Sequence, residues 1–476
     1  MGKTRGPFSL RGAAEWTFSS VIFAKGQEMS WTNPSVLALS RDRDPVEAIT
    51  SEARNVVFRA LESGWQGPPF DPFKLAELLG IQTHPTSEVL DARTVPIGPN
   101  RYRVDFNPDR PHRRTRYSIF HEIAHTLFPD CAQMIRTRGA HNASRRDDWQ
   151  LETLCNVAAA EFLLPIGSLA QVNNLCASVD TVLELRERYE ASAEAALLRL
   201  CRVTAEPALA FSSHRDHATD RYVIDYATPT AKAHWNLPAG WVLPSRTAAA
   251  QCTAIGYTAK QTEQWPSLGE VRAECIGIAP FPRDIYPRVI GFLRHVHLQP
   301  VNELSVTYLR GDATSTRGTG ARLLVQVVND GAFTWGGGGF AAAVKRRWPP
   351  AQKAFTERVT ADRSALRLGS VVTCALEPNV TLVSVVAQRG YGPSPHPRVR
   401  YGALREALLR VLEIAKERNA SVHMPRIGTG LAGGSWPVIE EIIREILTRA
   451  GIKVFVYDLP QGKEKTKAQR DLAFTA

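Results

Sequence analysis

The stretch Tyr117-Ser-Ile-Phe-His-Glu-Ile-Ala-His125 determines how the first half of this chain is interpreted. Its apolar positions recur with a helical period, and we predict an amphipathic helix at about residues 115–128. His121 and His125 are four residues apart, so a helix places both imidazoles on one face, close enough to share one Zn²⁺ ion. Glu122 lies beside them and can act as a general base toward water.

A catalytic zinc site needs a third protein ligand. Residues 151–164 form a strongly apolar predicted helix that is ended by Pro165 and follows the motif after a loop. It carries two carboxylates, Glu152 and Glu161. Either carboxylate is a candidate for the third ligand, although the position of Glu161 near the helix end suits a surface carboxylate better.

Both helices resemble those of the ImmA/IrrE family of metallopeptidases. In that family the motif helix is followed by a Glu-bearing helix that ends in Leu-Leu-x-Pro, and Phe162-Leu-Leu-Pro165 is a close but imperfect match. The resemblance covers about residues 40–205 and implies cleavage of a specific protein partner, often a helix-turn-helix repressor. The residues that it implies are the catalytic Glu122 and the zinc ligands His121, His125 and Glu152, the last of them 27 residues beyond the second histidine.

The overall charge allows a polyanionic partner without requiring one. The 476 residues include 58 Lys and Arg against 47 Asp and Glu, a formal net charge of +11. Basic clusters flank the motif helix within residues 110–116 and 136–146. They suit an acidic partner loop or DNA phosphates, but solvated loop charges explain them equally well, so DNA is a secondary partner.

The cysteines indicate a reducing compartment. All seven are scattered, with no C-x-x-C pair, which excludes a disulfide scaffold and favours a cytoplasmic protein. Cys131 and Cys155 lie near the motif, and we interpret them as buried structural thiols rather than metal ligands. No apolar run approaches the length of about 18 residues that a membrane span needs, so we expect no membrane partner.

The chain length fits about three domains, and composition and pattern divide it further. Residues 206–300 are rich in aromatic and β-branched residues without a helical period, and we interpret Trp235, Trp241 and Trp265 as core. The predicted segments are a flexible tail or a start assigned too early (1–28), a peptidase with a helical extension (29–205), a β-containing middle domain (206–302), an α/β domain (303–460) and a basic tail (461–476).

Two glycine-rich loops in the α/β domain each lie between a predicted strand and a helix. Trp335-Gly-Gly-Gly-Gly-Phe340 follows the strand at 323–328, and Gly428-Thr-Gly-Leu-Ala-Gly-Gly434 follows the strand at 420–424. Backbone N–H groups at a helix N-terminus suit phosphate oxygens, so two such loops on one sheet can clamp a diphosphate. Neither loop is a P-loop or a G-x-G-x-x-G fingerprint.

These loops, together with Gly311-Asp-Ala-Thr314, resemble a macro domain over about residues 303–460. The Pro-Arg-Ile-Gly-x-Gly-Leu run is similar to the branch that contains the terminal ADP-ribose glycohydrolase and a chromatin-remodeller reader. The resemblance implies an ADP-ribose pocket in which Asp312 accepts from the adenine amino group. The ligand-binding residues that it implies are Asp312, Asn329, Asp330, Gly336, Gly337, Gly338, Gly339, Phe340, Gly428, Thr429, Gly430, Leu431, Ala432 and Gly433.

The chain departs from the hydrolases of that branch at two positions. Those enzymes use a Lys on the fourth strand and an Asp after Gly-x-Gly-Leu, and the matching positions here are Gln388 and Ala432. A glutamine cannot form a Schiff base, and an alanine cannot act as acid or base. Binding without hydrolysis is therefore favoured, although Asp330 is a carboxylate that a hydrolase would be able to use instead.

We therefore expect a multidomain α+β and α/β protein. It would comprise a mostly helical zincin-like peptidase with a small sheet, a β-containing middle domain and a C-terminal α/β/α macro domain. The leading hypothesis is a zinc-dependent endopeptidase that cleaves a specific protein, such as a repressor, under the control of ADP-ribose or a related NAD-derived ligand, in stress response or phage defence. The alternatives are an ADP-ribose-binding adaptor or transcription regulator, and an ADP-ribosyl hydrolase.

Overall fold

The computed structural model gives the backbone of most of the chain. The residues that it describes are 31–132, 148–171, 175–216, 219–230, 233, 235–265, 268–280, 284–296, 306–335, 338–392 and 394–459. The predicted tails at 1–28 and 461–476 and the whole basic cluster within 136–146 lie outside them. None of the helices in these ranges combines the length and the apolar character that crossing a membrane requires.

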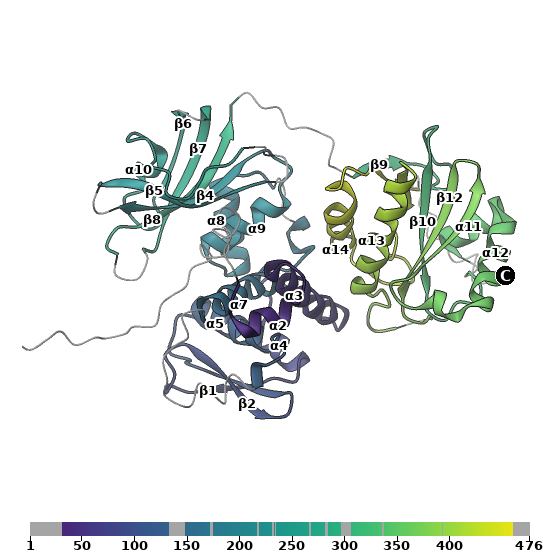
Figure 1. Ribbon diagram of the computed structural model, residues 1–476, viewed down its shortest axis with the longest axis horizontal. Helices are drawn as coiled ribbons and strands as arrows, with labels where there is room; N and C mark the ends of the chain where they lie inside the picture. Colours follow the sequence, from purple (N-terminus) through teal and green to yellow (C-terminus); the bar gives the residue numbers. More distant parts are fainter. Residues whose placement is uncertain are drawn as a thin grey trace, which may run out of the picture. The chain divides into compact units, whose positions relative to one another are not determined.

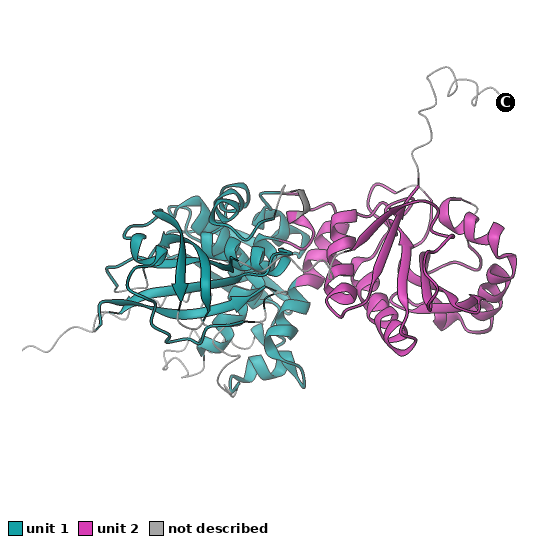
Figure 2. Ribbon diagram, turned by 90° about the horizontal axis from the view of Figure 1, so that it is seen from above, with its two compact units in different colours: residues 1–53, 68–164, 174–300 teal, residues 54–67, 165–173, 301–476 magenta. Residues whose placement is uncertain are grey.

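The chain divides into two compact units (Figure 2). Unit 1 contains residues 1–53, 68–164 and 174–300, and unit 2 contains residues 54–67, 165–173 and 301–476. Two short segments from the first half of the chain therefore belong to unit 2. The predicted domain boundaries at 205 and 302 are finer than this division and stay predictions.

The first half of the chain is mostly helical, as expected. Serine side chains mark two of the helix starts: Ser178 Oγ accepts from Thr181 N–H, and Ser192 Oγ accepts from Ala195 N–H. The helices are α2 (Pro34–Ser40), α3 (Pro45–Glu62), α4 (Pro72–Leu78), α5 (His112–His125), α7 (Asp148–Leu163), η2 (Ser168–Gln171), α8 (Val179–Tyr189) and α9 (Ala193–Val203).

The basic run at 110–116 is not a loop, and that expectation is wrong from His112 onward, where α5 begins. The arginines of its first turns already have protein partners, which is why a helix tolerates them. Arg113 and Arg114 pair with Glu187 and Asp91, and the buried Arg116 donates to the Phe70 carbonyl at 2.6 Å. This half of the basic surface is therefore largely neutralised within the protein.

A small sheet lies beside α5. Its strands β1 (Gln82–Pro85), β2 (Ala92–Gly98) and β3 (Arg101–Phe106) are arranged in the order β1-β3-β2. β2 and β3 form an antiparallel hairpin, and β1 runs parallel to β3. In the described part of the chain, β2 pairs on one side only and is an edge strand.

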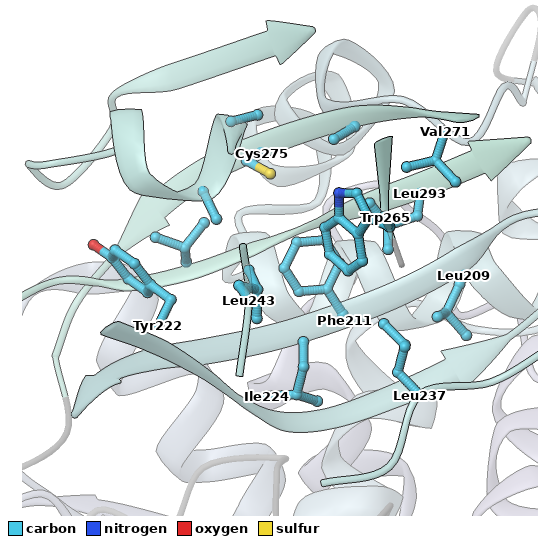
Figure 3. Close-up of a cluster of buried hydrophobic side chains, with 14 of the residues drawn as sticks. Leu209, Phe211, Tyr222, Ile224, Leu237, Leu243, Trp265, Val271, Cys275 and Leu293 are labelled. Atoms are coloured by element: carbon cyan, nitrogen blue, oxygen red, sulfur yellow. The ribbon is translucent and has the colours of Figure 1, made fainter. Parts of the chain in front are cut away.

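The middle segment is a five-stranded antiparallel sheet with one strongly apolar face. Figure 3 shows the side chains gathered over that face, with the Trp265 ring among them. Trp265 is 2% exposed and stacks on Trp241, with 5.1 Å between ring centroids. Trp235 and Trp241 also pack against this core, which confirms the core interpretation of all three tryptophans. The elements are β4 (Leu209–Asp216), β5 (Arg221–Pro229), α10 (Ala248–Gln251), β6 (Thr258–Trp265), β7 (Gly269–Ile278) and β8 (Arg288–His295) in the order β5-β4-β8-β7-β6.

Unit 2 is built on a six-stranded mixed sheet. Only the edge strand β11 is antiparallel, and the other neighbours run parallel. The strands are β9 (Thr307–Arg310), β10 (Arg322–Asn329), β11 (Val371–Glu377), β12 (Val380–Gln388), β13 (Ser421–Pro425) and β14 (Val454–Asp458) in the order β11-β12-β10-β13-β14-β9. All six overlap the strands that the sequence predicts, at residues 305–309, 323–328, 370–376, 380–387, 420–424 and 453–457.

Helices cover both faces of this sheet (Figure 1). The pair α11 and α12 lies on one face, and α13 and α14 lie on the other. The helical elements are α11 (Gly339–Arg347), α12 (Pro349–Ala361), η4 (Arg363–Leu366), α13 (Tyr401–Glu417), α14 (Trp436–Ile443) and η5 (Arg444–Thr448). The architecture is therefore multidomain α+β and α/β, as expected, and the carboxyl ends of the parallel strands meet at one edge, where such sheets usually bind ligands.

Candidate functional site

Two packed helices, α5 and α7, position the first candidate site. Phe120 and Ile123 on α5 have no exposed surface, and Phe120 lies against Phe162 of α7 with 6.1 Å between ring centroids. With these side chains in the core, His121 and His125 share another side of α5, and their ring centroids are 5.0 Å apart. The i, i+4 spacing thus produces the predicted pairing of imidazoles.

The carboxylate of Glu152 lies in front of both imidazoles. Its Oε2 is 3.0 Å from His121 Nε2, and its Oε1 is 3.8 Å from His125 Nε2. Two imidazole nitrogens and one carboxylate are the ligand set of many catalytic zinc sites. The donor chemistry of the three predicted ligands therefore fits a zinc ion.

Cys155 is a geometric competitor for the third position. One nitrogen of each of the two histidines and the Cys155 Sγ lie within 4.8 Å of one another. However, Sγ is 3.4 Å from His125 Nδ1, on the ring edge opposite Nε2. Only Glu152 faces the Nε2 atoms of both histidines, so we favour the carboxylate. Cys155 and Cys131 are buried and form no disulfide with another described residue. That neither of them binds the metal stays a prediction.

The electrostatics of the site favour a cation. Burial opposes protonation of His121, but a hydrogen bond to Glu152 and the charges of Glu122 and Glu152 outweigh it and raise the pKa of His121. Negative charge that stabilises a protonated imidazole also stabilises a bound metal ion. The charge balance therefore agrees with the donor chemistry.

Glu122 is held by a residue that the sequence did not reveal. The hydroxyl of Thr94, on the edge strand β2, lies 2.7 Å from Glu122 Oε2 and 2.9 Å from the Glu122 carbonyl oxygen. Thr94 is 7% exposed, so this contact is largely shielded from water. It fixes one carboxylate oxygen of the predicted general base.

Glu161 is not a surface carboxylate, and that expectation is wrong. Its side chain is 2% exposed and accepts from Arg202 Nη1 at 2.5 Å. The reason is that nearly every residue of α7 is buried, including those in its last turn. The ion pair explains how a charge is tolerated there and leaves Glu152 as the preferred ligand.

The second candidate site is a cavity of about 930 Å³ at the carboxyl edge of the unit 2 sheet. It is lined by Gly311 and Asp312 after β9, by Asn329 at the end of β10 and by the loops that follow β10 and β13. The predicted residues that line it are Asp312, Asn329, Gly338, Gly339, Phe340, Gly428, Thr429, Gly430, Leu431 and Ala432. One cavity therefore brings together residues from widely separated parts of the sequence.

Four predicted pocket residues are not among the lining. Gly336 and Gly337 lie outside the described residues. Asp330 accepts from Gly390 N–H at 2.9 Å, so its carboxylate supports the neighbouring loop. Gly433 bonds to the Gly430 carbonyl and shapes the turn of the second glycine loop.

The lining also includes buried polar side chains that sequence reasoning missed. Gln326 is 3% exposed, and its amide nitrogen donates to Ser384 Oγ at 2.9 Å. Its Oε1 and the Nε1 of the buried Trp335 have no hydrogen-bond partner in the described structure. Buried polar atoms of this kind usually have water or ligand partners. The glutamine interrupts an apolar strand, and this was the only signal in the sequence.

Comparison with known proteins agrees with the first site. Residues 77–201 match the family model of the IrrE N-terminal-like domain. The radiation response metalloprotease IrrE of Deinococcus deserti is 27% identical over 188 residues, which cover 36% of this chain and 67% of that protein.

The C-terminal part has its own relatives. The chromodomain-helicase-DNA-binding protein 1-like of Mus musculus is 29% identical over 175 residues, 35% of this chain. The chain spans only 19% of that relative. A solved macrodomain protein from Streptomyces coelicolor is 43% identical and covered to 99%, over 32% of this chain, with a TM-score of 0.29. The first half of the chain is therefore similar to an IrrE-like metallopeptidase domain, and the C-terminal part is similar to macrodomains.

The structure places two positions that we predict to differ from the related hydrolases in the wall of the cavity. Gln388 and Ala432, the predicted replacements for Lys and Asp, both line the cavity. Gln388 donates through Nε2 to the Gly390 carbonyl at 2.8 Å, so it supports a loop. The charged residues in the lining are Asp312, Arg346 and Arg426, which suits binding of an anionic ligand.

Proposed function

We propose that the IrrE-like domain is a zinc-dependent endopeptidase that cleaves a specific protein, and that ADP-ribose or a related NAD-derived ligand in the macrodomain regulates it. The observation that carries the proposal is the Glu152 carboxylate, which lies within 3.8 Å of the Nε2 atoms of both motif histidines. His121, His125 and Glu152 would hold the metal. A bound zinc ion supplies Lewis-acid polarisation of a peptide carbonyl and of water.

The protein groups around this centre support peptide hydrolysis. Glu122 can accept a proton from water and return it to the leaving amine, and Thr94 keeps its Oε2 in place at 2.7 Å. The edge strand β2, which carries Thr94, offers unpaired main-chain groups in the described structure. An extended peptide would align along such an edge by β-augmentation, which is why we infer an endopeptidase acting on a flexible segment, for example of a helix-turn-helix repressor.

The macrodomain pocket supports binding rather than hydrolysis. Backbone N–H groups at the start of α11 and in the 428–434 loop suit a diphosphate. Asp312 lines the cavity just after β9 and would accept a hydrogen bond from the adenine amino group. No lysine lines the described cavity, and Asp330 is already bonded to Gly390 N–H, so the groups that the related hydrolases use are not in place.

Contacts inside unit 2 support regulation. The loop that wraps the ligand ends at Ser435, whose N–H donates to Tyr401 Oη at 2.8 Å. Tyr401 N–H in turn donates to Glu62 Oε1 at 2.8 Å. Glu62 is the last residue of α3, a helix whose first half belongs to unit 1. A ligand that binds one arrangement of this loop better than another would therefore bias α3.

The test is a cleavage assay on the full chain with a panel of helix-turn-helix repressors, with and without saturating ADP-ribose. We expect cleavage of one repressor at one site, a rate that changes with ADP-ribose, and no cleavage by the matched Glu122→Gln variant. Cleavage that persists in Glu122→Gln would contradict the peptidase proposal. Equal rates across a titration in which calorimetry confirms ADP-ribose binding would contradict the regulation.

A further inference from the structure

We propose that Asn156 is a positioning residue of the metal centre: its side-chain oxygen, itself anchored by Tyr117, fixes the tautomer and ring orientation of His121. This inference rests on the proposed metallopeptidase function, but it concerns a residue outside the three ligands. Asn156 follows Glu152 by one helical turn on α7, so the ligand and the positioning residue share one face of the helix.

The geometry brings two polar groups to one oxygen. Asn156 Oδ1 lies 2.9 Å from His121 Nδ1 and 2.6 Å from Tyr117 Oη. Asn156 is 3% exposed, so these contacts are made with little competition from water. A buried asparagine that meets a ligand histidine on the edge away from the metal is suitably placed to orient the ring.

The hydrogen-bonding capacities select one tautomer of His121. A phenol keeps its proton at neutral pH, so Tyr117 can donate to Asn156 Oδ1 at 2.6 Å. The same oxygen can accept a second hydrogen bond only from a protonated Nδ1 of His121. With its proton kept on Nδ1, a neutral His121 would offer the lone pair of Nε2 to a metal ion shared with Glu152, which is the state that metal binding requires.

The second histidine is held differently. His125 Nδ1 faces the Cys155 Sγ at 3.4 Å, and a thiol is a weaker hydrogen-bond partner than an amide oxygen. Loss of the Asn156 amide should weaken metal binding more than loss of the Cys155 thiol, although the two residues are neighbours on α7.

The test measures metal affinity of the full chain and needs no substrate. Zn²⁺ affinity is determined by competition with a chromophoric chelator, and the Co²⁺-loaded protein is compared by absorption spectroscopy. The variants are Asn156→Leu, which keeps the volume, Asn156→Asp, which keeps an acceptor, Tyr117→Phe, which removes one hydroxyl, and Cys155→Ala as the matched control. Circular dichroism and thermal unfolding verify folding.

We expect Asn156→Leu to weaken Zn²⁺ binding by about 10- to 100-fold and to alter the Co²⁺ spectrum. Asn156→Asp should bind at least as well as the parent chain, Tyr117→Phe should weaken binding by a few-fold, and Cys155→Ala should leave it nearly unchanged. If Asn156→Leu does not fold, Asn156→Asp and Tyr117→Phe still test the proposal. Weakened Zn²⁺ binding by Asn156→Asp, or unchanged Zn²⁺ binding by Tyr117→Phe, overturns the positioning role.

Two other results have distinct meanings. Unchanged Zn²⁺ affinity in a folded Asn156→Leu variant overturns the positioning role but leaves the proposed metal centre unaffected. A parent chain that binds neither Zn²⁺ nor Co²⁺ overturns the proposed peptidase itself, and the positioning role with it.

Discussion

His423 of the macrodomain should make the stability of unit 2 depend on pH. This histidine on β13 has no exposed surface and stacks on Phe455, with 4.8 Å between ring centroids. Its Nδ1 lies 2.9 Å from Tyr457 Oη, and Tyr457 lines the ligand cavity. Burial, with a smaller contribution from the charge of Arg322, lowers the pKa of His423 from 6.5 to about 4.

The sign and size follow from proton linkage. Between pH 6.5 and pH 4 His423 is protonated in the unfolded chain but neutral in the folded chain. The stability that this residue provides is therefore complete above pH 6.5 and declines as the pH falls toward 4. The expected loss between about pH 7 and about pH 5 is about 2 kcal/mol. Carboxylates also begin to titrate near the lower pH, so the effect must be read as a difference from a variant.

The assay is urea unfolding of the full chain at both pH values, with unit 2 followed by NMR, for the parent and for His423→Gln. The parent should lose about 2 kcal/mol more than the variant on acidification, and the His423 ring should titrate well below an ordinary histidine. Equal pH dependence in the two proteins, or a ring pKa near 6.5, would refute the reasoning.

Three further predictions concern other parts of the chain. Trp265→Ala should destabilise the middle sheet by about 3–5 kcal/mol in urea unfolding, because a large buried ring leaves a cavity; a loss below about 1 kcal/mol would contradict its role in the core. Glu161→Gln should leave the zinc content unchanged. It should lower the free energy of unfolding by about 1 kcal/mol, since the partner Arg202 is partly exposed. Loss of zinc from this variant would indicate that Glu161 is a metal ligand. The parent should bind ADP-ribose about 10-fold more tightly than its inosine analogue in calorimetry. Asp312→Ala should abolish that preference. A preference that persists in Asp312→Ala would show that Asp312 does not bind the adenine amino group.

The sequence was sufficient for the parts of the fold and site that local pattern controls. The sequence spacing of His121 and His125 was enough to place both on one helix face, because residues i and i+4 of any α-helix lie on the same face. Glu152 came from a family resemblance, and the structure brings it to within 3.8 Å of both Nε2 atoms. The six predicted strands of unit 2 were recognisable because each is a short apolar run between turn residues.

What the sequence could not reveal depends on contacts between distant segments. Thr94 meets Glu122 only because β2 lies against α5, and no local pattern distinguishes it from any other strand threonine. The burial of Glu161 follows from neighbours on every side of α7, and its partner Arg202 is 41 residues away. Likewise, nothing in the sequence distinguishes Asn156 from an ordinary polar residue. Its role became apparent only from the structure, in which His121 Nδ1 lies 2.9 Å from Asn156 Oδ1.

The most direct test of the metal centre is the zinc content of the purified full chain after exhaustive dialysis, compared with folded Glu152→Ala and Cys155→Ala variants. We predict about one zinc per chain in the parent and in Cys155→Ala, and none in Glu152→Ala. Zinc retained by Glu152→Ala but lost from Cys155→Ala would contradict the account, because the thiol and not the carboxylate would then complete the site.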